Sequence, residues 1–372
     1  MTSIEEVHRR LWASVEEHDV GGVDAEIDRL VDDVEPLASP GEHARLVREV
    51  RARVDGLGPL QHLADDPSVT EIMVNAGSDV WVERHGELHR TSVVMTAVEA
   101  EHLVRRLASA VGRRIDRSSP TVDVRLADGA RLHAVLPPLA VDGPSITIRR
   151  FRPSPVGLEE MAPPAVANLL KAAVGAAATI LVAGSTGSGK TTLLNALAAC
   201  VPAEERLVTI EDSAELQLVN PHVVRLESQP EGSDHEGIDL RELVRNALRM
   251  RPDRLICGEM RGSEAFDLVQ ALNTGHHGSL TTVHANSPSD ALRRIEALVM
   301  LGGSGLPLPA VRQQLAASID LVVLMARGVG SSRRVMSVSE VPATVEADWC
   351  LRPLAVGTVI SKEPTRTWWD RT

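Results

Sequence analysis

After residue 155, short apolar runs alternate with segments whose apolar residues recur every three or four positions. Short apolar runs are typical of buried parallel strands, and the three-to-four spacing is typical of helices that bury one face. This alternation predicts an α/β domain with a mostly parallel sheet and helices on both faces. The predicted strands are 178–183, 206–211, 222–226, 254–258 and 279–284, and the predicted helices are 158–174, 190–200, 239–250, 263–273 and 287–300.

The first fifty-seven residues show a helical pattern instead. Three charged segments, 3–17, 24–34 and 42–55, each carry one apolar stripe at helical spacing. We therefore predict an N-terminal helical module over residues 1–57. Two roles stay open for it, a passive packing arm and a docking site for a partner helix.

Residues 58–150 carry strand-like alternation around one helical segment. A hairpin signal, Asp128-Gly129, lies between two of the predicted strands. The predicted strands are 70–75, 79–84, 88–95, 121–126, 130–136 and 145–150, and the predicted helix is 97–112. This pattern indicates a compact α+β domain, and the proline-containing segment 151–155 is the predicted linker to a third domain, 151–372.

Composition narrows the classes of partner. The 372 residues carry a net charge of −12, and aromatic side chains are scarce, with two Phe, five Trp and no Tyr. Acidic charge argues against a broad basic surface, and few aromatics argue against base-stacking platforms. We therefore do not expect nucleic acid as a partner. The longest apolar tract, 165–183, is interrupted by Lys171, so we expect no membrane span.

One turn carries the strongest chemical signal. Residues Gly184 to Thr191 match G-x-x-x-x-G-K-[ST], the phosphate-binding P-loop, between a predicted strand and a predicted helix. Its backbone N–H groups and the helix N-terminus attract phosphate, Lys190 reaches the outer phosphates and the Thr191 hydroxyl binds Mg²⁺. The predicted ATP-binding residues here are Gly184, Ser185, Thr186, Gly187, Ser188, Gly189, Lys190, Thr191 and Thr192.

Acidic residues follow two of the other predicted strands. Glu211 ends one strand, and Glu259 follows another, after a glycine at the position where many NTPases have a Mg²⁺-binding aspartate. Transfer of phosphate to water needs a group that orients or deprotonates the water, and we assign this role to Glu259. Glu211, Glu259 and Thr191 are the predicted Mg²⁺ residues, with Glu211 acting through the metal's water shell. The alternative for Glu259 is a solvated loop acid.

Histidines stand at both ends of the predicted strand 279–284. His276 precedes the strand and His284 ends it. We predict that both face the nucleotide, His284 as a catalytic residue and His276 as a γ-phosphate sensor. The alternative for each is a structural role, and zinc is not expected because no third ligand stands at a fixed spacing.

Together these motifs resemble the secretion-superfamily traffic ATPases, which combine a Walker A motif, an acidic "Asp box", a Walker B motif ending in Gly-Glu and a "His box". The His-box spacing resembles the branch shared by conjugative type IV secretion ATPases and Tad/CpaF pilus ATPases. The resemblance covers about residues 45–342. The segments that favour the Tad/CpaF type are Pro59-Leu60, 69–75, 112–116, 128–131, 292–296 and 311–315.

The resemblance implies a RecA-like P-loop C-terminal domain, a smaller PAS-like α+β domain and a cytoplasmic homohexamer. It implies that ATP and Mg²⁺ lie between the two domains, and that the ring is held at the inner face of the cell membrane by inner-membrane platform proteins. Hydrolysis would then drive Tad/Flp-type pilus assembly or protein export. The alternatives are a conjugative type IV secretion ATPase, a nucleic-acid translocase and a P-loop kinase. Neither residues 1–45 nor the tail after Pro342, with Trp349, Trp368 and Trp369, receives a role.

Arginines gather near the end of the α+β region. Two flank the Asp128-Gly129 turn and two end the last predicted strand before the linker. We predict that some face the triphosphate across the domain cleft and stabilise transition-state charge. Arg125 and Arg131 are the predicted catalytic arginines, Arg149 and Arg150 the predicted nucleotide contacts, and Arg113 and Arg114 further candidates. The alternative is a solvated or salt-bridged sheet edge.

Overall fold

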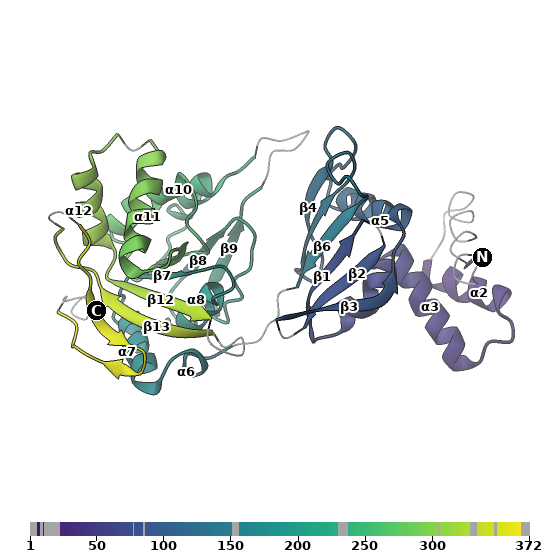
Figure 1. Cartoon of the computed structure of the whole chain (residues 1–372), viewed down its shortest axis with the longest axis horizontal. Coiled ribbons are helices and arrows are strands. Elements are labelled where there is room, and N and C mark those ends of the chain that lie inside the picture. Colours follow the sequence, from purple (N-terminus) through teal and green to yellow (C-terminus); the bar gives the residue numbers. More distant parts are fainter. Residues whose placement is uncertain are drawn as a thin grey trace. The chain divides into compact units, whose positions relative to one another are not determined.

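The computed structural model describes residues 6–7, 10, 23–76, 78–84, 86–150, 156–229, 237–303, 305–327, 333–345 and 348–365. The chain divides into two compact units, Met1–Arg152 and Pro153–Thr372, and each is described by itself (Figure 1). The further division predicted at residue 57 stays a prediction.

Helices open the N-terminal unit. Helix α2 (Val23–Val34) packs on α3 (Pro40–Val54) through a small cluster that includes Ile27, Val31 and Val50. Ser39 begins α3 with a capping box, in which its hydroxyl and the Glu42 carboxylate satisfy end N–H groups reciprocally. The two predicted helices in this region are confirmed. The third, 3–17, falls almost wholly outside the described residues.

An antiparallel sheet forms the rest of this unit. Among the described residues its strand order is β3-β2-β1-β6-β5-β4, and one face packs on α5 (Ala97–Ala110). The strands are β1 (Val69–Asn75), β2 (Asp79–Arg84), β3 (Glu87–Val94), β4 (Thr121–Arg125), β5 (Arg131–Val135) and β6 (Ser145–Arg149), with the short helices η1 (Gly58–Leu60) and α4 (Gln61–Asp65) before them. Alternate residues such as Ile72, Leu132 and Ile148 enter the core, and most of the side chains on the other face of the sheet are polar. The predicted hairpin is confirmed.

A larger sheet is the centre of the C-terminal unit. In its described part the strand order is β15-β14-β13-β12-β7-β11-β10-β8-β9. From β12 to β9 all pairings are parallel, and β13 to β15 add antiparallel strands at one edge. The strands are β7 (Ile180–Gly184), β8 (Leu207–Glu211), β9 (Val223–Glu227), β10 (Arg254–Cys257), β11 (Leu280–His284), β12 (Leu321–Arg327), β13 (Arg333–Glu340), β14 (Arg352–Val356) and β15 (Val359–Ile360). The predicted parallel sheet is confirmed, whereas β12 to β15 were not predicted.

Helices cover both faces of this sheet, as predicted. The helices are α6 (Leu158–Met161), α7 (Pro164–Gly175), α8 (Lys190–Ala198), α9 (Leu240–Ala247), α10 (Glu264–Asn273), α11 (Pro288–Leu301) and α12 (Leu308–Ser318). Ile180 and Val182 pack with α6, α7 and α8, whereas Leu181 and Ala183 pack with α9 to α12. The predicted single helix 158–174 is wrong, because Pro163 and Pro164 force Ala162 into an extended conformation and separate α6 from α7.

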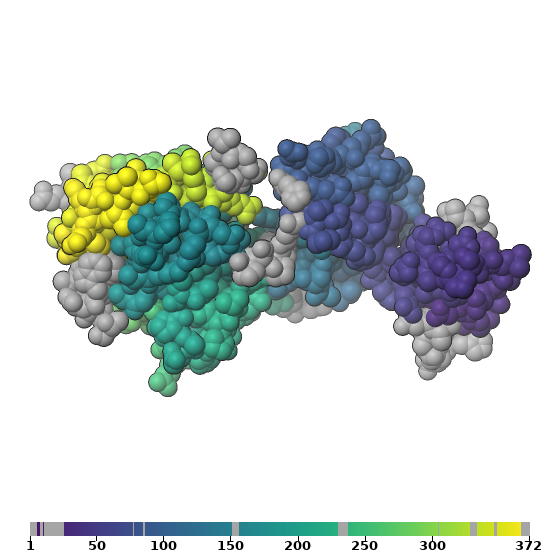
Figure 2. Space-filling view, turned by 90° about the horizontal axis from the view of Figure 1, so that it is seen from below, coloured from purple at the N-terminus to yellow at the C-terminus, as the bar shows by residue number. Residues whose placement is uncertain are grey.

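The C-terminal residues pack against earlier parts of the unit. Figure 2 shows the yellow C-terminal hairpin beside the teal helices that precede β7. Trp349 is buried, and its Nε1–H donates to Glu296 Oε1 at 2.7 Å, as does Arg312 Nε at 2.7 Å. Trp349 therefore fixes the tail to α11, while Trp368 and Trp369 lie outside the described residues. No helix in the described part of the chain is long and apolar enough to cross a membrane.

Candidate nucleotide-binding site

The turn between β7 and α8 has the backbone that a phosphate loop requires. Gly187 and Gly189 have positive φ angles of 72° and 95°, a conformation that side chains disfavour. At Gly184, an added Cβ would lie 2.5 Å from the Ser188 Oγ and 2.8 Å from the Met325 carbonyl oxygen. Glycine at these positions lets the loop close tightly at the carboxyl end of a fully buried strand.

Lys190 folds back over this loop. Its ammonium donates to the Gly184 carbonyl at 3.1 Å and to the Ser185 carbonyl at 3.0 Å, and lies 3.2 Å from His284 Nδ1. Burial lowers the pKa of Lys190, opposed by the negative charge of Glu259. Among the described residues the hydrogen-bond acceptors of this buried cation are neutral, so phosphate oxygens, which bind a cation more strongly, can replace them.

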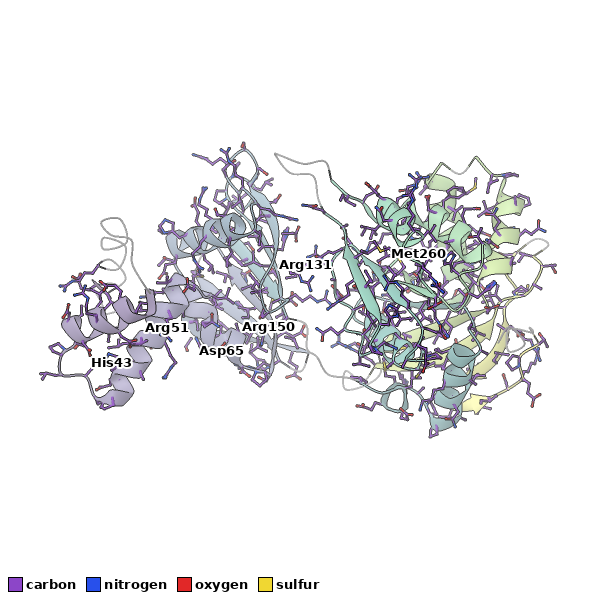
Figure 3. The ribbon with its side chains drawn as sticks, turned by 180° about the vertical axis from the view of Figure 1, so that it is seen from behind. His43, Arg51, Asp65, Arg131, Arg150 and Met260 are labelled. Carbon is purple, nitrogen blue, oxygen red and sulfur yellow. The ribbon has the colours of Figure 1, made fainter. Side chains whose placement is uncertain are left out.

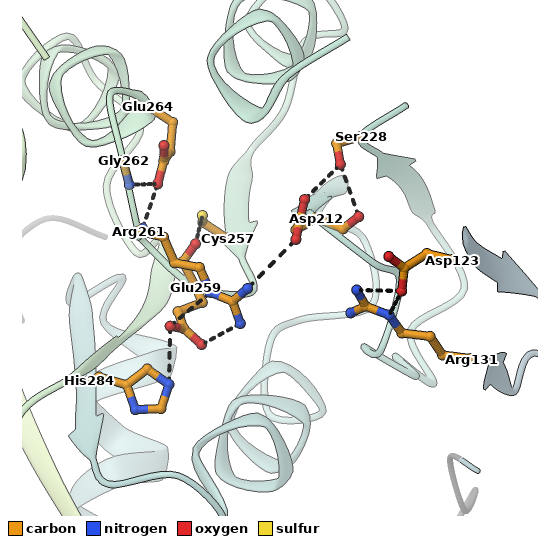
Figure 4. A network of polar contacts seen from close by, with 10 residues as sticks. All are labelled: Asp123, Arg131, Asp212, Ser228, Cys257, Glu259, Arg261, Gly262, Glu264 and His284. Carbon is orange, nitrogen blue, oxygen red and sulfur yellow. Dashed lines mark hydrogen bonds and ion pairs between the residues drawn. The ribbon is translucent and has the colours of Figure 1, made fainter. Parts of the chain in front are cut away.

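His284 connects the lysine to the glutamate. The parallel register places His284 beside Gly184, so the end of β11 lies next to the P-loop. Its Nδ1 faces Lys190, and its Nε2 lies 3.2 Å from Glu259 Oε1 (Figure 4). Burial and the Lys190 charge lower the pKa of His284, which favours the neutral ring. A neutral ring satisfies both neighbours when Nδ1 accepts from Lys190 and Nε2–H donates to Glu259.

Arg261, which the sequence analysis did not single out, completes this network. Its Nε lies 3.0 Å from Glu259 Oε1, and its Nη1 lies 3.6 Å from Asp212 Oδ2 (Figure 4). The loop that carries it is fixed by Glu264, whose Oε1 accepts from the N–H groups of Arg261 at 2.6 Å and Gly262 at 2.8 Å. In the sequence, the one signal for a role of Arg261 at this site is its position two residues after Glu259.

The structure explains why glycine follows β10. An added Cβ at Gly258 would lie 3.0 Å from the Cγ of Glu211, on the neighbouring strand β8. Glu211 therefore occupies the space that a side chain at 258 would need. Glu211 Oε1 accepts from the N–H groups of Glu215 at 2.8 Å and Leu216 at 2.9 Å, yet burial raises its pKa to about 7.

The oxygen atoms of this region suit a magnesium ion. Glu211 Oε2 and the Ser188 hydroxyl are buried and have no hydrogen-bond partner among the described residues. Mg²⁺ prefers carboxylate, hydroxyl and water oxygens, so Thr191, Glu211 and Glu259 form an appropriate donor set. When bound, the ion would supply positive charge to the phosphate oxygens. A cation near Glu211 would also favour its ionised form.

His276 does not lie beside the P-loop of its own chain. It precedes β11, which runs parallel to β7 with His284 at the level of Gly184. His276 therefore lies near the amino ends of the strands, at the opposite end from the P-loop. Its Nδ1 lies 3.1 Å from the carbonyl oxygen of Ala271, near the end of α10. The prediction that both histidines face this nucleotide site is therefore wrong, and a structural role explains the contact of His276.

Three of the predicted arginines form a row on the N-terminal unit. Arg125 pairs with Arg131 across β4 and β5, and Arg131 pairs with Arg149 across β5 and β6. Directly paired residues of antiparallel strands point to the same face, here the face opposite the buried core. Arg131 lies 3.3 Å from Asp123 Oδ1. Arg149 also stands opposite Glu71 of β1, so carboxylates flank the row, and its predicted contact with the triphosphate stays a proposal.

Arg150 belongs to a different environment. Its Nη1 donates to the carbonyl oxygens of Asp66 at 2.6 Å and Val69 at 3.2 Å, both within the same unit. Arg150 and Arg131 are labelled in Figure 3. Arg113 similarly donates to the Asp123 carbonyl at 2.6 Å. These guanidinium groups hold the backbone of the N-terminal unit, so the prediction that Arg150 contacts nucleotide is not supported by its observed partners.

The fold and the site together define a P-loop protein with a RecA-like C-terminal unit. The chain belongs to the family described as "Type II/IV secretion system protein", whose model matches residues 53–352. A putative conjugal transfer protein of Mycobacterium tuberculosis is 39% identical over 323 residues, covering 83% of this chain and 89% of that protein. The conjugal transfer protein TrbB of Rhizobium radiobacter is 35% identical over 306 residues, covering 80% and 90%.

A solved structure agrees with this fold. The Legionella pneumophila ATPase DotB superposes with a TM-score of 0.56 at 22% identity, covering 78% of this chain and 81% of that one. At this identity the similarity supports the fold alone.

Proposed function

We propose that this protein hydrolyses ATP with Mg²⁺ and uses the energy to drive a cell-envelope secretion or pilus machine. One observation carries the proposal: His284 joins the P-loop Lys190 to Glu259 by two contacts of 3.2 Å at one sheet edge. This places a phosphate-binding cation and a carboxylate that can activate water side by side. No acceptor pocket of a small-molecule kinase is needed for that chemistry.

Each group has a defined task in this proposal. Lys190 binds the outer phosphates, Thr191 and Glu211 hold Mg²⁺, and Glu259 orients or deprotonates the attacking water. Glu259 is held by Arg261 in the structure, so Arg261 must release or share it when water binds. We propose that the arginine row of Arg125, Arg131 and Arg149 supplies further positive charge to the triphosphate.

Membership of the family supports a proposal for the assembly. We propose a homohexamer that acts at the inner face of the cell membrane through inner-membrane platform proteins. Membrane contact through such partners accords with the net charge of −12, which disfavours direct binding to anionic lipid.

The cargo has two candidates. The segments quoted in the sequence analysis favour a Tad/Flp-type pilus motor, whereas the descriptions of the relatives name conjugal transfer. We propose pilus assembly or protein export as the first candidate and conjugative type IV secretion as the second. Deletion of the gene, followed by assays of surface pili and of plasmid transfer, separates them, because only the process that the motor drives is lost.

The basic activity is tested by steady-state phosphate release from the purified chain. We expect Mg²⁺-dependent hydrolysis that is not stimulated by DNA, and loss of nucleotide binding and turnover in Lys190→Ala. Lys171→Ala is a matched control, since Lys171 is an exposed lysine of the same unit that pairs with Glu159. Wild-type turnover in Lys190→Ala contradicts the site, and strong stimulation by DNA supports a translocase instead.

A further inference from the structure

The antiparallel edge of the C-terminal sheet brings an arginine to the P-loop. Met325 of β12 pairs with Gly184 of β7 on one side and with Val335 of β13 on the other. Since β13 runs antiparallel to β12, the residues before Val335 extend past the carboxyl edge of the sheet. Arg333, two positions earlier, shares the strand face of Val335, which packs in the same cluster as α8.

Two contacts fix Arg333 against the loop. An added Cβ at Gly189 would lie 2.8 Å from Arg333 Cδ, so the stem of the arginine covers this glycine. Its Nη1 donates to the Thr192 hydroxyl at 3.3 Å. Among the described residues no carboxylate forms an ion pair with Arg333. A guanidinium next to an anion site therefore has only a neutral, weakly held acceptor.

We propose that Arg333 is a nucleotide-binding residue whose guanidinium contacts the phosphate nearest the ribose; this rests on the proposed function. In a P-loop the backbone N–H groups of the glycine-rich turn bind the inner phosphates, whereas Lys190 and Thr191 serve the outer phosphates and Mg²⁺. Arg333 covers Gly189 of that turn and reaches Thr192, so its guanidinium lies on the side of the inner phosphates. Guanidinium binds phosphate through two parallel N–H donors, a stronger interaction than its present bond to a hydroxyl.

If Arg333 contacts the inner phosphate, its substitution should weaken the binding of every ligand that occupies the inner phosphate position. ADP and inorganic tripolyphosphate are the probes, measured by isothermal titration calorimetry on the full chain with Mg²⁺. We expect Arg333→Ala to raise both dissociation constants about tenfold or more, and Arg333→Lys, which keeps charge without the paired donors, to show a smaller loss. Arg334→Ala is the matched control, because Arg334 is exposed on the opposite face of the same strand. It should stay within about twofold of wild type.

The outcomes separate this inference from the proposed function. If wild type and Arg334→Ala bind both probes and Arg333→Ala binds them equally well, Arg333 is not a ligand and the proposed function stands. Loss for ADP alone assigns the contact to the nucleoside and overturns the phosphate assignment. If the folded wild-type chain binds neither probe, the proposed function itself fails and this inference with it.

Discussion

The two ends of the parallel strands in the C-terminal sheet each bury a charged side chain, and the two side chains are in different states. At the amino edge, Arg254 is 1% exposed and binds Glu205 through Nε at 2.5 Å and Nη2 at 2.8 Å, and its Nη1 donates to the Val174 carbonyl at 2.7 Å. At the carboxyl edge, Ser188 and Glu211 each bury an oxygen without a partner among the described residues. Because an unpaired buried carboxylate oxygen is destabilising, Glu211 at the carboxyl edge is placed to meet a ligand, whereas Arg254 at the amino edge is placed for stability.

The two histidines near the two ends of strand β11, His276 and His284, show the same contrast only eight positions apart. His284, at the carboxyl end of β11, lies between Lys190 and Glu259, whereas His276, before its amino end, contacts a helix carbonyl. The residue type alone therefore does not decide function. The sheet edge decides it, because ligands of parallel α/β sheets bind beyond the carboxyl ends of the strands.

The largest expected effect is on turnover at the carboxyl edge. Glu259→Gln keeps the shape of the side chain and removes the base, so turnover should fall by about 10²–10⁴-fold while ATP affinity stays near wild type. Phosphate release and fluorescence-detected ATP binding measure the two quantities. Equal loss of both would assign Glu259 to binding or to Mg²⁺ rather than to water activation.

A change at the amino edge should act on stability instead. Arg254→Met leaves the partly exposed Glu205 without its partner and the Val174 carbonyl unpaired, and an unsatisfied buried acceptor costs about 1–3 kcal/mol. Thermal unfolding should show a lower transition temperature, with ATP binding by the folded fraction unchanged. Arg249→Met, at an exposed position on the same unit, should leave the transition in place. An unchanged transition in Arg254→Met contradicts the comparison.

The buried carboxylate predicts a pH dependence of intermediate size. Burial raises the pKa of Glu211 from 4.5 to about 7, so the native chain keeps a proton that the unfolded chain releases. The free energy of unfolding should therefore fall as pH rises from about 4.5 to 7, by an amount on the order of 3 kcal/mol, and stay lower above that range. Glu211→Gln removes this part of the profile. Transition temperatures at several pH values without Mg²⁺ test it, and parallel profiles for both proteins would refute it.

The smallest expected effects are the changes in turnover caused by substitution of the two histidines. His284→Ala removes the bridge between Lys190 and Glu259, so turnover should fall about tenfold. His276→Ala removes one hydrogen bond at the other edge, which contributes about 1 kcal/mol or less, and turnover should stay within about twofold. Similar losses of turnover in both variants would mean that His276 serves a nucleotide site after all.

The sequence by itself determined the local parts of this protein. The spacing of apolar residues gave the strands and helices between residues 178 and 300, because each element buries a face that its own residues encode. The P-loop was readable for the same reason, since its glycines and Lys190 act within one turn. The break between α6 and α7 was also readable from Pro163 and Pro164, but the prediction gave the apolar spacing more weight than the prolines.

Only the tertiary structure decided which distant residues meet. Strands β12 to β15 have no helix between them and weak alternation, so their pairing depends on the sheet that they join. Glu211 occupies the space beside Gly258, and Arg333 reaches Thr192 across 141 residues of sequence. Arg150 and His276 received structural partners for the same reason. Strand order and register fix these contacts, and neither is encoded by any single segment, because both arise from pairing among all the strands at once.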